Sequence, residues 1–75
     1  MKIITVSPAA DYHIAICFDN NHMVTLDMRE KLQTLRFSDL RNEQTFRGVQ
    51  TDGKALYWPG GISMSISEIL ELVAK

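Results

Sequence analysis

The only cysteine of the chain lies between its two histidines, and these three residues are the first candidates for chemistry. Cys17 comes four positions after His13 and five before His22. A metal site needs its ligands around one ion, yet four residues of an extended strand span roughly 13 Å. The sequence contains neither a CxxC pair nor a helical HxxxH pair. We therefore interpret Cys17 as a small packing residue with two exposed histidines near it, and we expect no metal and no cofactor.

Three carboxylates in the middle of the chain are the second candidate, because paired carboxylates can act as general acid and base. They are Asp27, Glu30 and Asp39. Asp27 followed three positions later by Glu30 matches a helix capping box, and Asp39 after Ser38 is typical of a turn. Capping and turn formation account for all three residues. We therefore expect no catalytic residues, and we expect that the protein is not an enzyme.

Pro59-Gly60-Gly61 could hold a phosphate ahead of a helix. A phosphate-binding loop continues with Lys and then Ser or Thr, which this chain lacks, and the next helix signal comes only at Ser65. We interpret the two glycines as a sharp reversal from a strand into that helix.

Tyr57 and Trp58 are the strongest candidates for binding. Adjacent residues of a strand face opposite sides, so both cannot enter the core of a sheet that is buried on one face. One of them is expected at the surface, where aromatic side chains are common in interfaces with partners. The alternative is that Trp58 anchors the core and Tyr57 only covers Gly48. Together with Arg47, Tyr57 and Trp58 make up the predicted interaction surface.

The composition predicts one globular domain over residues 1–75, since 45% of the residues are apolar and 23% are charged. A chain this short buries only about 60% of its unfolded surface, so a second copy or a small cognate protein would add burial. One cysteine excludes an intrachain disulfide. No signal peptide is recognisable, and no segment approaches the ~20 apolar residues of a membrane span. We expect a cytoplasmic protein without a membrane partner.

The formal net charge of −1 provides no overall attraction to a polyanion. Six of the eight basic residues lie between Arg29 and Lys54, but four acidic residues are interspersed among them, which leaves a local excess of two (six minus four). This balance is typical of a mixed, solvated surface. We do not expect the isolated domain to bind nucleic acid.

Three strands are predicted in the first part of the chain. Lys2–Val6 is rich in β-branched residues, and the proline in Ser7–Asp11 is expected to end that strand. Tyr12–Phe18 alternates between apolar and other residues, and a three-residue loop, Asn20–His22, connects it to Val24–Met28. The predicted pairs are Phe18 with Val24, Ile16 with Leu26 and Ile14 with Met28.

Two helices are predicted. Asp27 is expected to cap a short middle helix, whose inward-facing residues are Met28, Leu32 and Leu35. Ser65 and Glu68 match a capping box for a C-terminal helix. The apolar residues of that helix are Ile66, Ile69, Leu70 and Val73, and its outward-facing residues are Glu71 and Lys75.

Phe46 is expected to open a central hairpin around Asp52-Gly53, which is typical of a two-residue turn. The predicted pairs are Val49 with Leu56 and Gly48 with Tyr57. The expected fold is α+β. It has one small antiparallel sheet of about five strands, made of two hairpins and the N-terminal strand, with a short middle helix and a C-terminal helix packed on the sheet.

The spacing of several short motifs resembles that of a small bacterial family, Domain of Unknown Function 2442 (DUF2442). The central ones are Phe46-Arg47-Gly48-Val49, Asp52 and Leu56-Tyr57-Trp58-Pro59-Gly60-Gly61. Others are Asp11-Tyr12, Phe18-Asp19 and Val24-Thr25-Leu26-Asp27-Met28. The chain departs from the family pattern at Gly60, Ser63 and Asn21, where relatives tend to have Asn, an acidic residue and Gly.

The resemblance implies a small α+β domain with an antiparallel sheet and no established activity. Members are often encoded beside small proteins suspected of being toxins, which implies the role of a neutralising partner. The leading hypothesis is a non-enzymatic protein-interaction module that binds a small cognate protein or forms a homo-oligomer. The alternative is a regulatory nucleic-acid-binding component of a complex.

Overall fold

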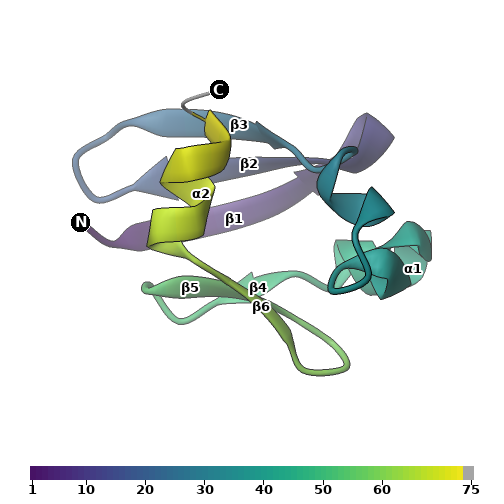
Figure 1. Cartoon of the computed structure of the whole chain (residues 1–75). Coiled ribbons are helices and arrows are strands. Elements are labelled where there is room, and N and C mark those ends of the chain that lie inside the picture. Colours follow the sequence, from purple (N-terminus) through teal and green to yellow (C-terminus); the bar gives the residue numbers. More distant parts are fainter. Residues whose placement is uncertain (74–75) are drawn as a thin grey trace.

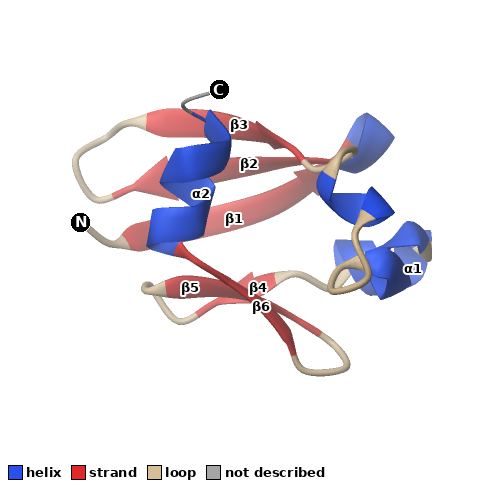
Figure 2. Cartoon of the chain, in the orientation of Figure 1, coloured by secondary structure: helices blue, strands red, loops and turns tan. Residues whose placement is uncertain are grey.

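The computed structural model describes residues 1–73, which form two antiparallel sheets of three strands each and a C-terminal helix (Figures 1 and 2). The first sheet contains β1 (Ile3–Ala9), β2 (His13–Phe18) and β3 (Met23–Asp27), in that order. The second contains β4 (Gln50–Thr51), β5 (Ala55–Trp58) and β6 (Ile62–Ser65). The helices are α1 (Glu43–Arg47) and α2 (Ile66–Val73). The α+β class is confirmed, but the strands are divided between two sheets instead of forming one sheet of about five strands.

Alternating apolar residues set the two faces of β2. Ile14, Ile16 and Phe18 are buried on the inner face, as predicted. However, β2 pairs with β3 through Ile16 opposite Val24 and Ile14 opposite Leu26, so the predicted register is wrong by two residues. A shift of two leaves every side chain on the same face, and for this reason the hydrophobic pattern does not distinguish these registers.

Pro8 does not end the first strand, which continues to Ala9. β1 is an edge strand, where proline is tolerated because its nitrogen can face away from the neighbouring strand. The chain then reverses within a short 3₁₀ turn, Ala10–Tyr12. Asp11 and Tyr12 both adopt left-handed backbone conformations there, with φ of 56° and 58°. The predicted break therefore begins about three residues too early.

The segment between β3 and α1, residues 28–42, is called the middle segment below. It contains two 3₁₀ turns, Lys31–Gln33 and Ser38–Arg41, in place of the predicted middle helix. Asp27 does not cap a helix with Glu30, because its carboxylate accepts hydrogen bonds from the amide and the guanidinium of Arg29. The side chain of Leu35 is 93% exposed, so its predicted inward position is wrong.

Phe46 lies in the short helix α1 and not in a strand. The side chain of Asn42 caps this helix, with its Oδ1 accepting from the amides of Gln44 and Thr45 at 3.0 and 3.4 Å. The helix carries Phe46 into the core, where it is 1% exposed. The predicted central hairpin therefore begins only at Gln50.

The turn between β4 and β5 is wider than the two-residue turn that Asp52-Gly53 predicts. Thr51 pairs with Leu56, so the predicted register is wrong by two residues here as well. The Oδ1 of Asp52 accepts from the amides of Lys54 and Ala55, at 2.9 and 3.2 Å. These bonds stabilise a longer turn, a local effect typical of Asp side chains.

Pro59-Gly60-Gly61 connects two strands and does not lead into a helix. Trp58 pairs with Ile62 across this turn, and β6 follows before α2 begins. Gly60 and Gly61 have φ of 91° and 82°, which most other residues avoid. The strand-to-helix reversal predicted for this segment is therefore wrong.

The C-terminal helix begins where the sequence predicts. The Oγ of Ser65 accepts a hydrogen bond from the amide of Glu68 at 3.2 Å, which confirms the N-cap. Ile69 is fully buried, while Leu70 and Val73 are each 43% exposed. The helix crosses the strands of the first sheet and reaches β3 (Figure 1). Glu71 is exposed as predicted, and the outward position predicted for Lys75 lies outside the described residues.

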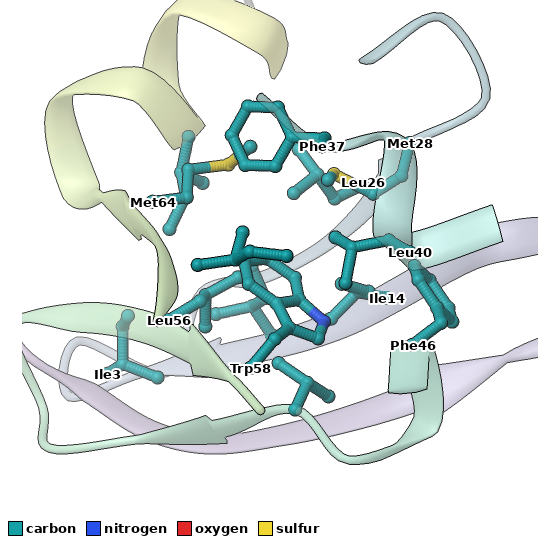
Figure 3. Packing of buried hydrophobic residues seen from close by; sticks show 14 of the residues in the cluster. Ile3, Ile14, Leu26, Met28, Phe37, Leu40, Phe46, Leu56, Trp58 and Met64 are labelled. Carbon is teal, nitrogen blue, oxygen red and sulfur yellow. The ribbon is translucent and has the colours of Figure 1, made fainter. Parts of the chain in front are cut away.

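A single cluster of buried apolar side chains joins both sheets, α1, α2 and the middle segment (Figure 3). Ile14 and Leu26 come from the first sheet, and Leu56, Trp58 and Met64 from the second. Phe37 and Trp58 meet edge to face, with ring centroids 6.3 Å apart. The core therefore lies between the two sheets, and the middle segment and α2 enclose it.

Candidate functional site

Tyr57 and Trp58 occupy opposite faces of β5, as their alternation predicts. Trp58 is 4% exposed and belongs to the core, whereas Tyr57 is 43% exposed on the outer face of the second sheet. Tyr57 lies between Gln50 of β4 and Ser63 of β6. Of the predicted pair, Tyr57 is therefore the residue that a partner can reach.

The hydroxyl of Tyr57 donates a hydrogen bond to Oδ2 of Asp52 at 3.0 Å. The other carboxylate oxygen of Asp52 accepts backbone amides of the turn, so the ring is tied to a fixed part of the hairpin. Asp52 raises the pKa of Tyr57, mainly because the hydrogen bond to the carboxylate is lost when the phenol ionises. No sequence signal indicates this pairing, because the predicted two-residue turn leaves the two side chains unconnected.

Gly48 is covered by Pro59, and not by Tyr57 as the alternative interpretation of the sequence predicts. A Cβ atom at Gly48 would lie 3.0 Å from Cγ and 3.1 Å from Cδ of Pro59. The two residues bring the end of α1 against the turn between β5 and β6. The exposed face of Tyr57 is thus not required to fill the space above a glycine.

Arg47 is exposed at the end of α1 and lines a small pocket of about 150 Å³. The pocket lies between α1 and the turn that joins β1 to β2; its lining residues are Ala9, Asp11, Tyr12, Glu43, Phe46 and Arg47. The hydroxyl of Tyr12 donates to the backbone carbonyl of Arg41 at 2.6 Å, which holds this turn against the middle segment. The volume of the pocket is below the roughly 300 Å³ at which small-molecule sites begin.

The histidines and the cysteine do not converge. The Nδ1 of His13 lies 3.0 Å from the carbonyl oxygen of Asp11. The other ring nitrogen lies 3.7 Å from the carboxylate of Asp27. His22 contacts Asn20 in the turn between β2 and β3. Within residues 1–73, no group of three His, Cys, Asp or Glu side chains is placed to hold a metal ion.

Asp27 and Arg29 form a close ion pair at the end of β3, with 2.8 Å between Nη2 and Oδ2. Hydrogen bonds from the Arg29 side chain, and then from its backbone amide, hold the pKa of Asp27 well below its usual value. Asp39 lies in the first turn of the 3₁₀ segment Ser38–Arg41, which agrees with the turn interpretation. The carboxylate of Asp27 therefore has a local structural role.

Arg36 is bound within the fold. Its guanidinium donates to both carboxylate oxygens of Glu68, at 2.7 and 2.9 Å, and to the carbonyl of Ser63 at 2.7 Å. Arg41 donates to the carbonyl of Leu32 at 2.9 Å. Arg29 and Arg36, two of the six basic residues between Arg29 and Lys54, are thus paired with carboxylates, which reduces the positive charge available to a polyanion.

No helix within residues 1–73 is long and apolar enough to cross a membrane.

Comparisons with known proteins place the chain in a family but give it no activity. The comparison with curated proteins and the comparison with solved structures found no match. A family model described as "Protein of unknown function (DUF2442)" matches residues 3–75, nearly the whole chain. The suspected family is thereby confirmed, and the chain belongs to the DUF2442 family.

Proposed function

We propose that the protein is a non-enzymatic protein-interaction module that binds a small cognate protein through the surface around Tyr57. The observation that carries the proposal is the exposed, anchored ring of Tyr57 on a sheet face that no described element covers. Tyrosine supplies a large contact area and a polar tip at a low cost in side-chain entropy. Because Asp52 already holds the hydroxyl, little ordering is needed on binding.

The role we propose is that of a neutralising partner of a small toxin-like protein, which is the role that the family resemblance implies. Arg47 is the charged residue that we include in the same surface, because it is exposed and ends α1 three positions before the second sheet begins at Gln50. We propose a cytoplasmic location for the complex.

The test is co-expression of the chain with the small protein encoded beside it, followed by affinity capture and a measurement of the dissociation constant. We expect Tyr57→Ala to weaken binding by about 2 kcal/mol, the value typical of an aromatic hot spot. Tyr57→Phe removes only the hydroxyl and is expected to retain most of the affinity. Leu35→Ala is the matched control, because Leu35 is an exposed apolar residue on the middle segment.

Capture that is equally strong for Tyr57→Ala and for the unmodified chain would exclude this surface. If the adjacent gene product is not captured and the chain stays monomeric in light scattering, the interaction module itself is wrong.

A further inference from the structure

The outer edge of β3 presents backbone groups that have no strand beside them. In an antiparallel ladder, only every second residue exchanges hydrogen bonds with a given neighbour. The amide of Phe18 donates to the carbonyl of His22 at 2.9 Å, so the even-numbered residues of β3 face β2. The N–H and C=O groups of the odd-numbered residues therefore point away from the sheet. These residues are Met23, Thr25 and Asp27, and no other backbone group of residues 1–73 bonds to them.

The opposite edge of the same sheet is protected, and β3 is not. On β1, Pro8 lacks an N–H group, the pairing shifts between Ile3 and Thr5, and the amide of Ile3 donates to the carbonyl of Gly53 at 2.9 Å. Prolines, irregular pairing and covering segments are the usual means by which proteins block an edge. β3 contains no proline, no lysine and no irregular pairing. Its single charge, on Asp27, is neutralised by an arginine two residues away.

Exposed apolar side chains flank this edge on both sides. Met23 is 74% exposed on the outer face of the sheet. On the inner face, α2 reaches β3, and its Leu70 and Val73 are each 43% exposed (Figure 1). An edge with apolar flanks is suited to the addition of another strand, in which main-chain bonds supply affinity and side chains fix the register.

We propose that β3 pairs in antiparallel orientation with β3 of a second copy of this chain, around a two-fold axis at Thr25. In that register Thr25 lies opposite its own equivalent, and Met23 lies opposite Asp27 of the second copy. Every outward-facing residue then exchanges hydrogen bonds, about six in total. With an axis at Val24 or Leu26, one of the three outward-facing residues would have no residue of the second β3 opposite it. The first sheets of the two copies become one continuous sheet.

The side chains agree with this register. Threonine opposite threonine is a favourable cross-strand pair, and no two like charges lie directly opposite one another. Val24, which is only partly buried in the single chain, lies beside Leu26 of the second copy on the inner face. The two copies of α2 approach the axis from both sides, which brings their exposed Leu70 and Val73 toward each other.

This inference rests on the proposed function in one respect, since it gives an interaction module a second surface and a second partner. That surface is separate from Tyr57, which lies on the other sheet. The two proposals can therefore fail independently.

The experiment measures the oligomeric state by sedimentation velocity up to a concentration of about 1 mM, because an interface of this limited size is typical of weak complexes. We expect a reversible dimer. Thr25→Lys and Thr25→Glu should each weaken the dimer by at least about tenfold, because like charges then meet at the axis. A mixture of the two variants should dimerise again, since only a residue on the axis meets its own equivalent.

Thr5→Lys is the matched control. Thr5 is an exposed threonine on β1, where it pairs with Cys17 of β2, and it lies two strands away from the proposed interface. Its substitution by lysine should leave the dimer unchanged. A dimer that Thr5→Lys also disrupts would indicate that the outer sheet face, and not the β3 edge, joins the copies.

A second test uses the unmodified chain, in case the Thr25 variants do not fold, and measures amide hydrogen exchange as a function of protein concentration. The amides of Met23, Thr25 and Asp27 should gain protection as the concentration rises, whereas the amide of Val6 at the edge of β1 should not. A chain that remains monomeric at 1 mM, with these three amides unprotected at every concentration, overturns the proposal. Equally strong capture of the partner by Tyr57→Ala and by the unmodified chain, with an intact dimer, would overturn the proposed function alone.

Discussion

The guanidinium of Arg36 holds both carboxylate oxygens of Glu68, at 2.7 and 2.9 Å, and thereby joins the middle segment to the first turn of α2. The same guanidinium donates to the carbonyl of Ser63 in β6. Its central carbon also lies 4.7 Å from the centre of the Phe37 ring. One side chain thus connects three parts of the chain that meet above the core.

Glu68→Gln should lower the free energy of unfolding by about 0.5 to 1 kcal/mol at neutral pH, because it removes the negative charge from the bidentate but partly exposed ion pair with Arg36. Arg36 lowers the pKa of Glu68, so the folded state binds that proton more weakly than the unfolded state does. The carboxylate therefore stabilises the fold at neutral pH, and this contribution is lost as the pH falls through its folded-state pKa. Urea titrations of both proteins should converge once the pH lies below the lowered folded-state pKa of Glu68.

A constant difference between the two proteins from pH 7 to pH 3 would contradict this assignment. Glu71→Gln, on an exposed position of the same helix, is the control and should have little effect at either pH.

Trp58 has a buried indole nitrogen without a hydrogen-bond partner among the described residues, and Figure 3 shows it within the apolar cluster. We expect Trp58→Ala to cost about 3 to 5 kcal/mol through the cavity it creates. Trp58→Phe should cost much less, because it removes the unsatisfied N–H group, which itself costs about 1 to 3 kcal/mol. Unfolding followed by circular dichroism measures both. Equal losses for the two variants would show that the N–H group is satisfied in solution.

Gly48 is expected to resist substitution for a steric reason. A methyl group there would meet the ring of Pro59 at 3.0 Å, so Gly48→Ala should cost about 1 to 3 kcal/mol. Pro59→Ala removes the opposing ring atoms, and the double variant should therefore be less destabilised than the sum of the single variants. Additive losses in thermal unfolding would locate the strain elsewhere, for example at the backbone carbonyl of Thr45, whose oxygen would lie 3.3 Å from the added methyl group.

The anchoring of Tyr57 can be measured as a shift in its ionisation. Asp52→Asn should lower the pKa of Tyr57 toward its ordinary value of 10.0, because it removes the carboxylate that accepts the hydrogen bond of the phenol and, with it, the negative charge that opposes ionisation. The absorbance of tyrosinate reports this titration, and a Tyr12→Phe background leaves one tyrosine to observe. If the curve does not move, the hydroxyl of Tyr57 is not bound to Asp52 in solution.

The isolated chain should show no salt-sensitive binding to DNA or RNA in fluorescence anisotropy. Arg29 and Arg36 are paired with carboxylates of the chain itself, which reduces the number of cations that can displace counterions from a polyanion. Binding that weakens steeply with added salt would support the alternative function as a nucleic-acid-binding component.

The faces of the strands can be predicted from the sequence, but their pairing cannot. Ile14, Ile16 and Phe18 are buried as their spacing predicts, and Tyr57 and Trp58 divide between surface and core as alternation requires. Both predicted hairpin registers are wrong by two residues, a shift that changes no face. The choice between such registers depends on turn hydrogen bonds, such as those of Asp52, that no periodic pattern contains.

Local signals fail where a residue type has more than one use. Pro8 is expected to end a strand, although an edge position tolerates it. Pro59-Gly60-Gly61 is expected to lead into a helix, and this interpretation conceals β6 and with it the second sheet. The cap of α2 at Ser65 is predicted correctly, because its donor and acceptor lie within one turn. For the candidate site, the sequence identifies Tyr57 but not its partner.

The hydrogen bond from the amide of Ile3 to the carbonyl of Gly53 has a consequence for biosynthesis. It joins the beginning of the chain to a turn in the second half, and Ile69 of α2 completes the same core. While the ribosome is still producing the second half, the inner faces of β1, β2 and β3 have nothing to cover them. Nascent chains should therefore be most exposed to chaperones and proteases until α2 has emerged, and shortening the chain before Ile69 should abolish folding altogether.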